Sequence, residues 1–336
     1  MNYLSFVIKE VNKTHPHLGE PLAMAMLAVK ASKLLLFVAP HGCGKSRITS
    51  FIATQAPEVF LRDAISVAGL GNLQGELTGF TGALIIDDLS KGGTTYAQIK
   101  TVTTLAELVY SHYCARDMAD SHYSITDFYG SAIANIQPIL LRDVIKSPEW
   151  EASMMDKSIR YYHLYRPLNP NPFPPEIQLD FGIDYKLTDI PKLKGKLANS
   201  LFYIAESQWG LARMKEHLSD LLRASAALDK RRKVNISDYN LLLKILKPLK
   251  LERLVSDKTD LEGERYLNNN QLALLTEFAT YGQFTLKQLA KDYQMSQSKC
   301  YTIMNKYAND WKVVSKTPTT YAPSEDLRKI LREVGI

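Results

Sequence analysis

The residues best suited to chemistry lie at positions 39–46, where the sequence reads APHGCGKS. Two glycines, Gly42 and Gly44, let the backbone curl so that successive N–H groups point at one anion. Lys45 is spaced to reach the β- and γ-phosphates of a nucleotide, and the Ser46 hydroxyl is a ligand for Mg²⁺. The pattern is that of a phosphate-binding loop in which Ala39 replaces the first glycine.

The segments around this loop have the form that such a loop requires. Residues 34–38, LLLFV, have the length and content of a buried parallel strand, and a helical pattern resumes beyond residue 46. The positive end of that helix would face the same anion. We therefore expect the loop to bind ATP with Mg²⁺, and we also assign a nucleotide contact to an arginine at position 48 in the helix. The expected loop contacts are Ala39, Pro40, His41, Gly42, Cys43, Gly44, Lys45 and Ser46.

Two further apolar runs end in polar residues. Residues 83–88, ALIIDD, predict a buried strand that carries Asp87 and Asp88 to its carboxyl end. Asp87 would hold the Mg²⁺ ion through its water shell, and Asp88 would orient or activate the attacking water. Residues 131–136, SAIANI, predict another strand, on which Asn135 is placed to touch the γ-phosphate or that water.

Composition and charge limit the class of protein. The 336 residues are 46% hydrophobic, with no apolar run near the ~18 residues of a membrane span and no signal-peptide core, so we expect a cytoplasmic protein without membrane contact. Three cysteines far apart in sequence favour neither disulfides nor a zinc site. Residues 1–183 carry a net charge of −2, whereas 184–264 and 265–336 each carry +4. This excess favours a polyanionic partner for the C-terminal half.

The chain divides by pattern into three segments. Residues 1–183 predict an α/β nucleotide-binding core with a parallel sheet, 184–264 a helical lid and linker, and 265–336 a small helical domain ending in a hairpin. Residues 112–130 are rich in Tyr, His and Asp. The histidines of this stretch have no metal-ligand spacing and are interpreted as loop and surface.

Taken together, residues 1–250 resemble an AAA+ ATPase, with a lid similar to those of MCM helicases and MoxR-type ATPases. The resemblance rests on the loop, the Asp-Asp strand, the Asn135 strand and the helical lid. It implies that Asn135 is the sensor 1 residue. Arg213, inside R-x-x-E-x-x-x-x-L-L-R-A-S-A-A-L, matches the sensor 2 arginine, which contacts the γ-phosphate from the lid.

Two departures from the family pattern concern catalysis and assembly. Asp88 stands where the family usually has Glu. In the segment that often carries the arginine finger acting on a neighbour's ATP, Lys157 occupies the arginine position, and Arg160 or Arg142 could substitute. The resemblance implies a homo-oligomer, with a hexameric ring as one possibility, and Arg142 is slightly favoured as the finger because it closely follows the Asn135 strand.

Residues 265–336 resemble a winged helix-turn-helix. Residues 284–290 and 295–299 have the spacing of a support helix, a tight turn and a recognition helix. Apolar residues Leu286, Leu289, Met295 and Ile303 would form the small core. Residues expected to face duplex DNA, from the recognition helix and the wing, are Gln297, Ser298, Lys299, Thr302, Lys306, Lys312 and Lys316.

The sequence therefore predicts a Mg-ATP-dependent AAA+ ATPase that binds DNA through a winged helix and works in DNA replication as an initiator, helicase loader or small helicase. Two alternatives remain open. One is a MoxR-like chaperone whose wing docks a protein client, and the other is a non-hydrolysing ATP switch.

Overall fold

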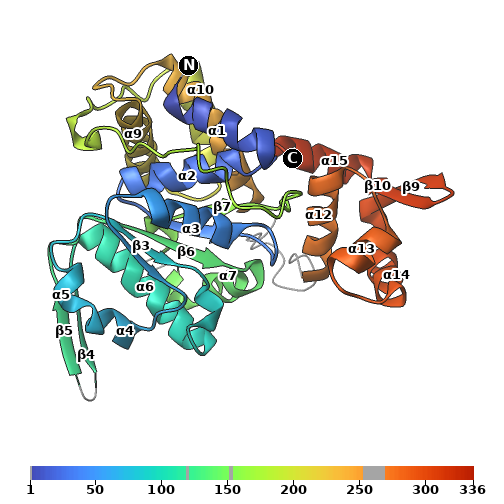
Figure 1. Cartoon of the computed structure of the whole chain (residues 1–336), viewed down its shortest axis with the longest axis horizontal. Coiled ribbons are helices and arrows are strands. Elements are labelled where there is room, and N and C mark those ends of the chain that lie inside the picture. Colours follow the sequence, from blue (N-terminus) through green and yellow to red (C-terminus); the bar gives the residue numbers. More distant parts are fainter. Residues whose placement is uncertain (1, 119–120, 151–153, 253–268) are drawn as a thin grey trace.

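The computed structural model describes residues 2–118, 121–150, 154–252 and 269–336 (Figure 1). Its centre is a five-stranded sheet in the order β2-β3-β6-β1-β7, in which every neighbouring pair is parallel. The prediction of an α/β fold with a parallel sheet is confirmed. The strands are β1 (Leu34–Val38), β2 (Val59–Arg62), β3 (Ala83–Ile86), β6 (Ser131–Ile136) and β7 (Ser158–Tyr162).

Alternate residues of each central strand enter two different hydrophobic clusters, because successive side chains of a strand point to opposite faces. On β1, Leu35 and Phe37 join one cluster, whereas Leu34, Leu36 and Val38 join the other. Both faces of the sheet are therefore covered, which explains why β1, β3 and β6 are continuous apolar runs rather than alternating ones.

The first cluster contains residues of the N-terminal helices, the phosphate-loop helix and the later helical segment: α1 (Tyr3–Thr14), α2 (Gly19–Lys30), α3 (Lys45–Gln55), α8 (Lys196–Ala205), α9 (Leu211–Leu228) and α10 (Ile236–Ile245). The second contains residues of α4 (Val67–Asn72), α5 (Gln74–Leu77), α6 (Thr95–Ser111) and α7 (Pro138–Ile145). Short 3-10 helices are η1 (Leu89–Lys91), η3 (Met155–Lys157), η4 (Tyr185–Leu187) and η5 (Lys247–Leu251).

The histidines of residues 112–130 lie on the surface, as predicted, since His112 and His122 are exposed, but His122 lies in a strand rather than in a loop. This stretch contains an antiparallel hairpin of β4 (Cys114–Met118) and β5 (Ser121–Ile125). Tyr123 and Ile125 are buried in the second cluster against the sheet's helices. The polar residues that suggested a loop occupy the outward positions of the strands, so tertiary burial of alternate residues decided the structure.

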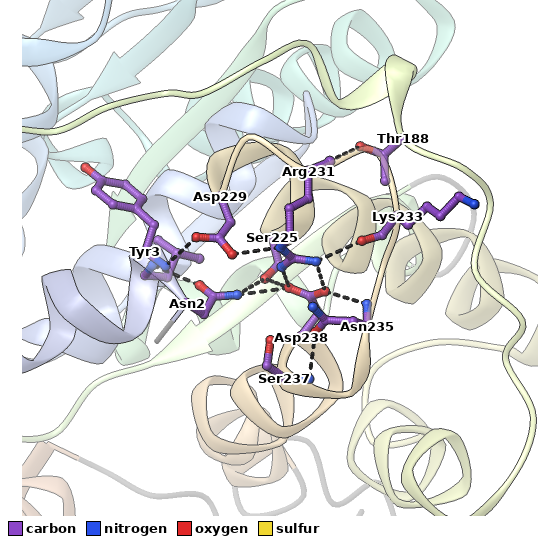
Figure 2. Close-up of polar contacts among 11 residues, drawn as sticks. Asn2, Tyr3, Thr188, Ser225, Asp229, Arg231, Lys233, Asn235, Ser237 and Asp238 are labelled. Atoms are coloured by element: carbon purple, nitrogen blue, oxygen red, sulfur yellow. Dashed lines mark hydrogen bonds and ion pairs between the residues drawn. The ribbon is translucent and has the colours of Figure 1, made fainter.

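A buried polar network joins the start of the chain to the helical segment (Figure 2). Asp238, fully buried on α10, accepts hydrogen bonds from Arg231 (Nη2 to Oδ1, 2.7 Å), Asn2 (2.9 Å) and Ser225 (2.8 Å). Asp238 also completes a capping box with Asn235, the N-cap of α10. Because these partners come from distant parts of the chain, the helical segment is anchored to the N-terminal helix.

The C-terminal segment, residues 269–336, is a group of small elements whose buried apolar side chains belong to the second hydrophobic cluster. Its three-stranded sheet has the order β8-β10-β9, and the hairpin of β9 and β10 projects away from the large sheet (Figure 1). The elements are α12 (Asn269–Tyr281), β8 (Phe284–Thr285), α13 (Leu286–Asp292), α14 (Gln297–Lys306), η6 (Ala308–Asp310), β9 (Trp311–Lys316), β10 (Thr319–Pro323) and α15 (Glu325–Glu333).

Candidate phosphate-binding site

The loop at 39–46 follows β1 and leads directly into α3. Gly42 and Gly44 have φ angles of 79° and 82°, in the left-handed region that glycine adopts without strain. Lys45, the first residue of α3, donates hydrogen bonds from Nζ to the carbonyl oxygens of Ala39 (2.7 Å) and Pro40 (3.0 Å). The loop thus closes around its own lysine, at the N-terminal end of an 11-residue helix.

Burial tunes the titratable groups of the loop. Burial lowers the pKa of Lys45, and the neighbouring carboxylates Asp87 and Asp88 oppose this. Burial also raises the pKa of the Cys43 thiol to about 12. Cys43 therefore stays a neutral thiol at physiological pH, and its Sγ lies 3.7 Å from the carbonyl oxygen of Leu164. These facts suit a packing role for Cys43 and exclude a thiolate nucleophile.

The structure brings Asp87 and Asn135 together with the loop helix. Oδ1 of Asp87 accepts hydrogen bonds from Thr49 Oγ1 (2.9 Å) and from Asn135 Nδ2 (3.0 Å). The parallel pairing of β1 with β6 aligns Phe37 with Asn135, which puts Asn135 near the carboxyl end of the sheet. Oδ1 of Asn135 is buried and has no hydrogen-bond partner among the described residues. A buried acceptor without a partner is rare, so this atom fits a bound water or ligand donor.

Asp88 has a different environment, one residue further on. It is the N-cap of η1, where its Oδ1 accepts from the backbone N–H of Ser90 (3.0 Å) and from the Ser90 hydroxyl (2.5 Å). Oδ2 of Asp88 takes no hydrogen bond within the described part of the chain. One oxygen is thus held by the turn, and the other is available to a water molecule.

A cavity of about 460 Å³ lies between the loop and these carboxylates. Its cations are Lys45, Arg47 and Lys91, and its anions are Asp87 and Asp88. The full lining is His41, Gly42, Cys43, Gly44, Lys45, Ser46, Arg47, Asp87, Asp88, Lys91, Gln137 and Pro167. A loop with two left-handed glycines at a helix N-terminus, a lysine and a carboxylate suits a polyphosphate with Mg²⁺. The hydroxyl of Ser46 and the carboxylate of Asp87 would hold the ion.

The arginine contact assigned to position 48 was wrong, because residue 48 is Ile48 and the arginine precedes it as Arg47. Ile48 is 1% exposed and belongs to the first hydrophobic cluster. An apolar side chain packed in the core offers no hydrogen-bond donor to a phosphate. Arg47 is instead the residue that lines the cavity, one position closer to the loop.

The described residues contain no group of three or more His, Cys, Asp or Glu side chains able to hold a metal ion. This agrees with the donor set of the cavity, because Mg²⁺ in nucleotide sites takes most of its ligands from phosphate and water and only one or two from the protein.

Arg213 is not brought to this cavity. Its Nη1 pairs with Glu216 (2.7 Å), and its guanidinium lies over the ring of Tyr110, 4.8 Å from the centroid. Glu216 and Asp220 in turn pair with Lys33, the residue before β1. These contacts are at the amino ends of the strands, whereas the phosphate loop is at their carboxyl ends. The sensor 2 contact that the resemblance implies is therefore not formed within this chain.

The three candidates for the arginine finger have unlike surroundings. Arg160, on β7, is 1% exposed and bonds to Glu252 (3.1 Å) and to the carbonyl oxygens of Gln208 and Ser158 (2.9 Å each). A guanidinium held inside its own chain cannot reach a neighbour's nucleotide, so Arg160 is a structural residue. Lys157 is half-buried on η3. Arg142 lies on α7, directly after the Asn135 strand, and its side chain lies outside the described part.

The residues expected to face DNA are all exposed on α14 and the β9–β10 hairpin: Gln297, Ser298, Lys299, Thr302, Lys306, Lys312 and Lys316. The predicted small core is formed by buried Leu289 and Ile303, against which Leu286 and Met295 pack. Exposed apolar side chains lie on the same elements, because Tyr301, Val313 and Val314 are 56%, 45% and 48% exposed.

The C-terminal segment is held to the core next to the phosphate loop by Arg166. Nη1 of Arg166 lies 3.1 Å from Glu277 Oε1 and 3.4 Å from Asp292 Oδ2, and its guanidinium stacks 3.9 Å from the ring centroid of Tyr293. The backbone N–H of Arg166 donates to Thr280 Oγ1 (3.0 Å). Arg166 is 12% exposed and Glu277 fully buried, so this is a buried ion pair between core and C-terminal segment.

We expect Arg166→Ala to release the C-terminal segment, because removing one partner leaves Glu277 buried without a counter-charge. Breaking such a pair typically costs about 3–5 kcal/mol. Limited proteolysis and thermal unfolding should register the loss. Lys230→Ala is the control, since its pair with Asp180 (2.7 Å) is exposed at both ends and contributes little to stability. Equal stability of the two variants would contradict this view of Arg166.

The pH dependence of stability measures the cost of burying the charged form of Glu277. Burial raises the pKa of Glu277 to about 7, although the charge of Arg166 opposes the shift. The folded protein therefore binds this proton more tightly than the unfolded chain, whose ordinary value is 4.5. Stabilisation from Glu277 should be complete below pH 4.5 and decline as the pH rises through 7. Glu277→Gln should flatten this part of the profile.

Some of these residues were missed by sequence reasoning. Thr49 stands four residues after Lys45 on one helix, so its place on the same side of α3 could have been found from helical spacing. Lys91, which lines the cavity, was not among the residues that the sequence singled out. The partnership of Arg166 with Glu277 joins positions 111 residues apart and left no local signal.

No protein-family model matches the sequence, and no curated protein resembles it at a significant level. Within the described ranges, no helix is both long and apolar enough to cross a membrane.

Proposed function

We propose that this chain is a cytoplasmic, Mg-ATP-dependent ATPase of the AAA+ class that binds duplex DNA through a C-terminal winged helix and works in DNA replication. One observation carries the nucleotide part. Oδ1 of Asp87 accepts hydrogen bonds from Thr49 on the loop helix and from Asn135 on β6, which joins three motifs separated in sequence. A loop helix, a carboxylate and a side-chain amide that contact one another at the carboxyl edge of a parallel sheet are suited to binding and hydrolysing a phosphate chain.

Each functional group that we propose for this site has one role in binding or hydrolysis. The loop N–H groups and Lys45 would hold the phosphates, while Ser46 and Asp87 would hold Mg²⁺. Mg²⁺ in such a site neutralises charge on the phosphate oxygens. Asp88 would orient the attacking water and accept its proton through Oδ2, while its Oδ1 stays fixed by Ser90. Asn135 would direct its free Oδ1 toward the same water.

Two arginines implied by the family resemblance, Arg213 and Arg160, do not line the described cavity. Arg213 is held at the far edge of the sheet, and Arg160 is buried. We therefore propose a homo-oligomer in which a neighbouring copy completes the site, with Arg142 or Lys157 as its contributing residue. A hexameric ring is one arrangement that such head-to-tail contacts can close.

The DNA part is tested by salt dependence. Binding of the full chain to a duplex should weaken with salt, because Lys299, Lys306, Lys312 and Lys316 would displace counterions from phosphates. We expect a slope of log affinity against log salt of roughly −2 to −4. Replacing Lys299 and Lys306 by Ala should reduce that slope by about two units and weaken binding to all DNA sequences to the same extent. Lys9→Ala together with Lys13→Ala on α1 is the control.

The exposed apolar residues Tyr301, Val313 and Val314 favour a second candidate, a MoxR-like ATPase whose wing docks a protein client. ATP turnover measured with and without duplex or single-stranded DNA, together with mass measurement in ATP, separates the candidates. DNA-stimulated turnover supports the first. Turnover insensitive to DNA, with no salt-dependent DNA binding, supports the second, and ATP binding without turnover supports a non-hydrolysing switch.

A further inference from the structure

The candidate nucleotide cavity has one exposed cation whose partner can be exchanged. Lys91 lines this cavity, and its Nζ lies 2.7 and 2.9 Å from the two carboxylate oxygens of Asp63. The two side chains are 53% and 69% exposed. An ion pair so open to water contributes little to stability, so a doubly charged phosphate group can displace Asp63 from the lysine.

The turn that carries Lys91 is fixed to the end of β3, the strand that precedes Asp87 and Asp88. The backbone N–H of Lys91 donates to the carbonyl oxygen of Asp88 (3.2 Å). Asp88 is also the N-cap of η1, the 3-10 helix that contains Lys91. On the other side, Nε2 of Gln98 donates to the carbonyl oxygens of Ser90 (2.8 Å) and Gly93 (2.9 Å). The backbone of Lys91 is thereby held three residues from Asp88, while its side chain can still move.

The other cations of the cavity, Lys45 and Arg47, are bound to backbone carbonyl oxygens rather than to a carboxylate. Lys45 bonds to the loop, and Arg47 donates to the carbonyl oxygens of Asn169 (2.6 Å) and Pro170 (2.7 Å). Arg213 and Arg160 are held elsewhere. Among the cations lining the described cavity, Lys91 is thus the one joined only to an exposed carboxylate.

We propose that Lys91 is a phosphate-contacting residue that leaves Asp63 and binds the terminal phosphate of ATP from within the same chain. This inference rests on the proposed nucleotide site and adds a residue that distinguishes ATP from ADP. Asp63 is then a resting partner that holds the lysine at the rim when no terminal phosphate is present. A lysine suits this exchange because its ammonium is a point charge on a flexible stem.

The test compares the affinities of the full-length protein for a non-hydrolysable ATP analogue and for ADP, both with Mg²⁺. Lys91→Gln should lose about 10- to 100-fold in affinity for the analogue and little for ADP, because one charge-assisted contact disappears. Lys91→Arg should recover most of the loss. Asp63→Asn should bind the analogue up to about five-fold more tightly, since the competing carboxylate is gone.

A matched control is Lys100→Gln, which removes another lysine from an ion pair, with Glu149 (2.9 Å), outside the cavity lining. Its ratio of affinities should equal that of the parent. The proposal for Lys91 is overturned if Lys91→Gln discriminates the analogue from ADP as well as the parent does, or if the parent does not discriminate at all. If the parent protein binds neither nucleotide, the proposal of a nucleotide site is itself refuted.

Discussion

Replacing Lys45 by alanine is expected to abolish tight ATP binding while leaving the fold intact. The Nζ atom of Lys45 bonds only to carbonyl oxygens of its own loop, so its loss removes no contact between distant elements. Those carbonyl groups border an open cavity where water can replace the ammonium. The phosphates, in contrast, would lose a charge-assisted contact, which lowers affinity on the order of 100-fold.

The measurement is nucleotide affinity by calorimetry, with circular dichroism and thermal unfolding as checks on the fold. Lys13→Ala is a suitable control, because Lys13 forms an exposed pair with Glu10 on α1. Both variants should unfold near the parental temperature, and only Lys45→Ala should lose affinity. Parental ATP affinity in Lys45→Ala would refute the assignment of the loop at 39–46.

The second large effect concerns turnover. Asp88→Asn should keep ATP binding and lose about 10²- to 10⁴-fold in hydrolysis rate, the usual contribution of a group that orients water and accepts its proton. Asparagine retains the Oδ1 acceptor, so the bonds from Ser90 and the η1 turn should persist. Only the proton-accepting oxygen is replaced by a donor.

Asp87→Asn separates the roles of the adjacent carboxylates. Its Oδ1 can still accept from Thr49 and Asn135, but the charge that would hold Mg²⁺ is gone, so Mg²⁺-dependent binding should weaken. Single-turnover rates and Mg²⁺ titrations of both variants give the comparison, with the exposed Asp117→Asn as control. Parental turnover in Asp88→Asn would reduce Asp88 to a turn residue.

The elements around the loop were predictable because their signals are local. The runs at 34–38 and 131–136 are β1 and β6 with the same bounds, since strands buried on both faces are mostly apolar, with Ser131 and Asn135 as the polar residues of β6. The polar residues Asp87 and Asn135 end such runs, and parallel strands present their carboxyl ends at one edge. Their place at that edge was therefore predictable, whereas their direct hydrogen bond depends on β3 and β6 being neighbours in the sheet.

The arginines show where local pattern does not suffice. Arg213 lies within a helical pattern that the sequence predicts well, yet its position depends on how α9 packs against the rest of the chain. In the structure, Glu216 and Asp220 of α9 pair with Lys33 at the amino edge of the sheet, which carries Arg213 away from the loop. Arg160 is buried because Glu252, 92 residues away, neutralises it.

The sequence by itself determined the phosphate loop, its flanking strand and helix, and the acidic and amide residues at the strand ends, because each depends on neighbours a few positions away. Only the tertiary structure decided that the hairpin at 114–125 packs as strands, that Arg213 and Arg160 are held elsewhere, and that Arg166 joins the core to Glu277. These outcomes depend on charges and apolar surfaces brought together from distant positions, and no local periodicity encodes which distant partner neutralises a buried charge.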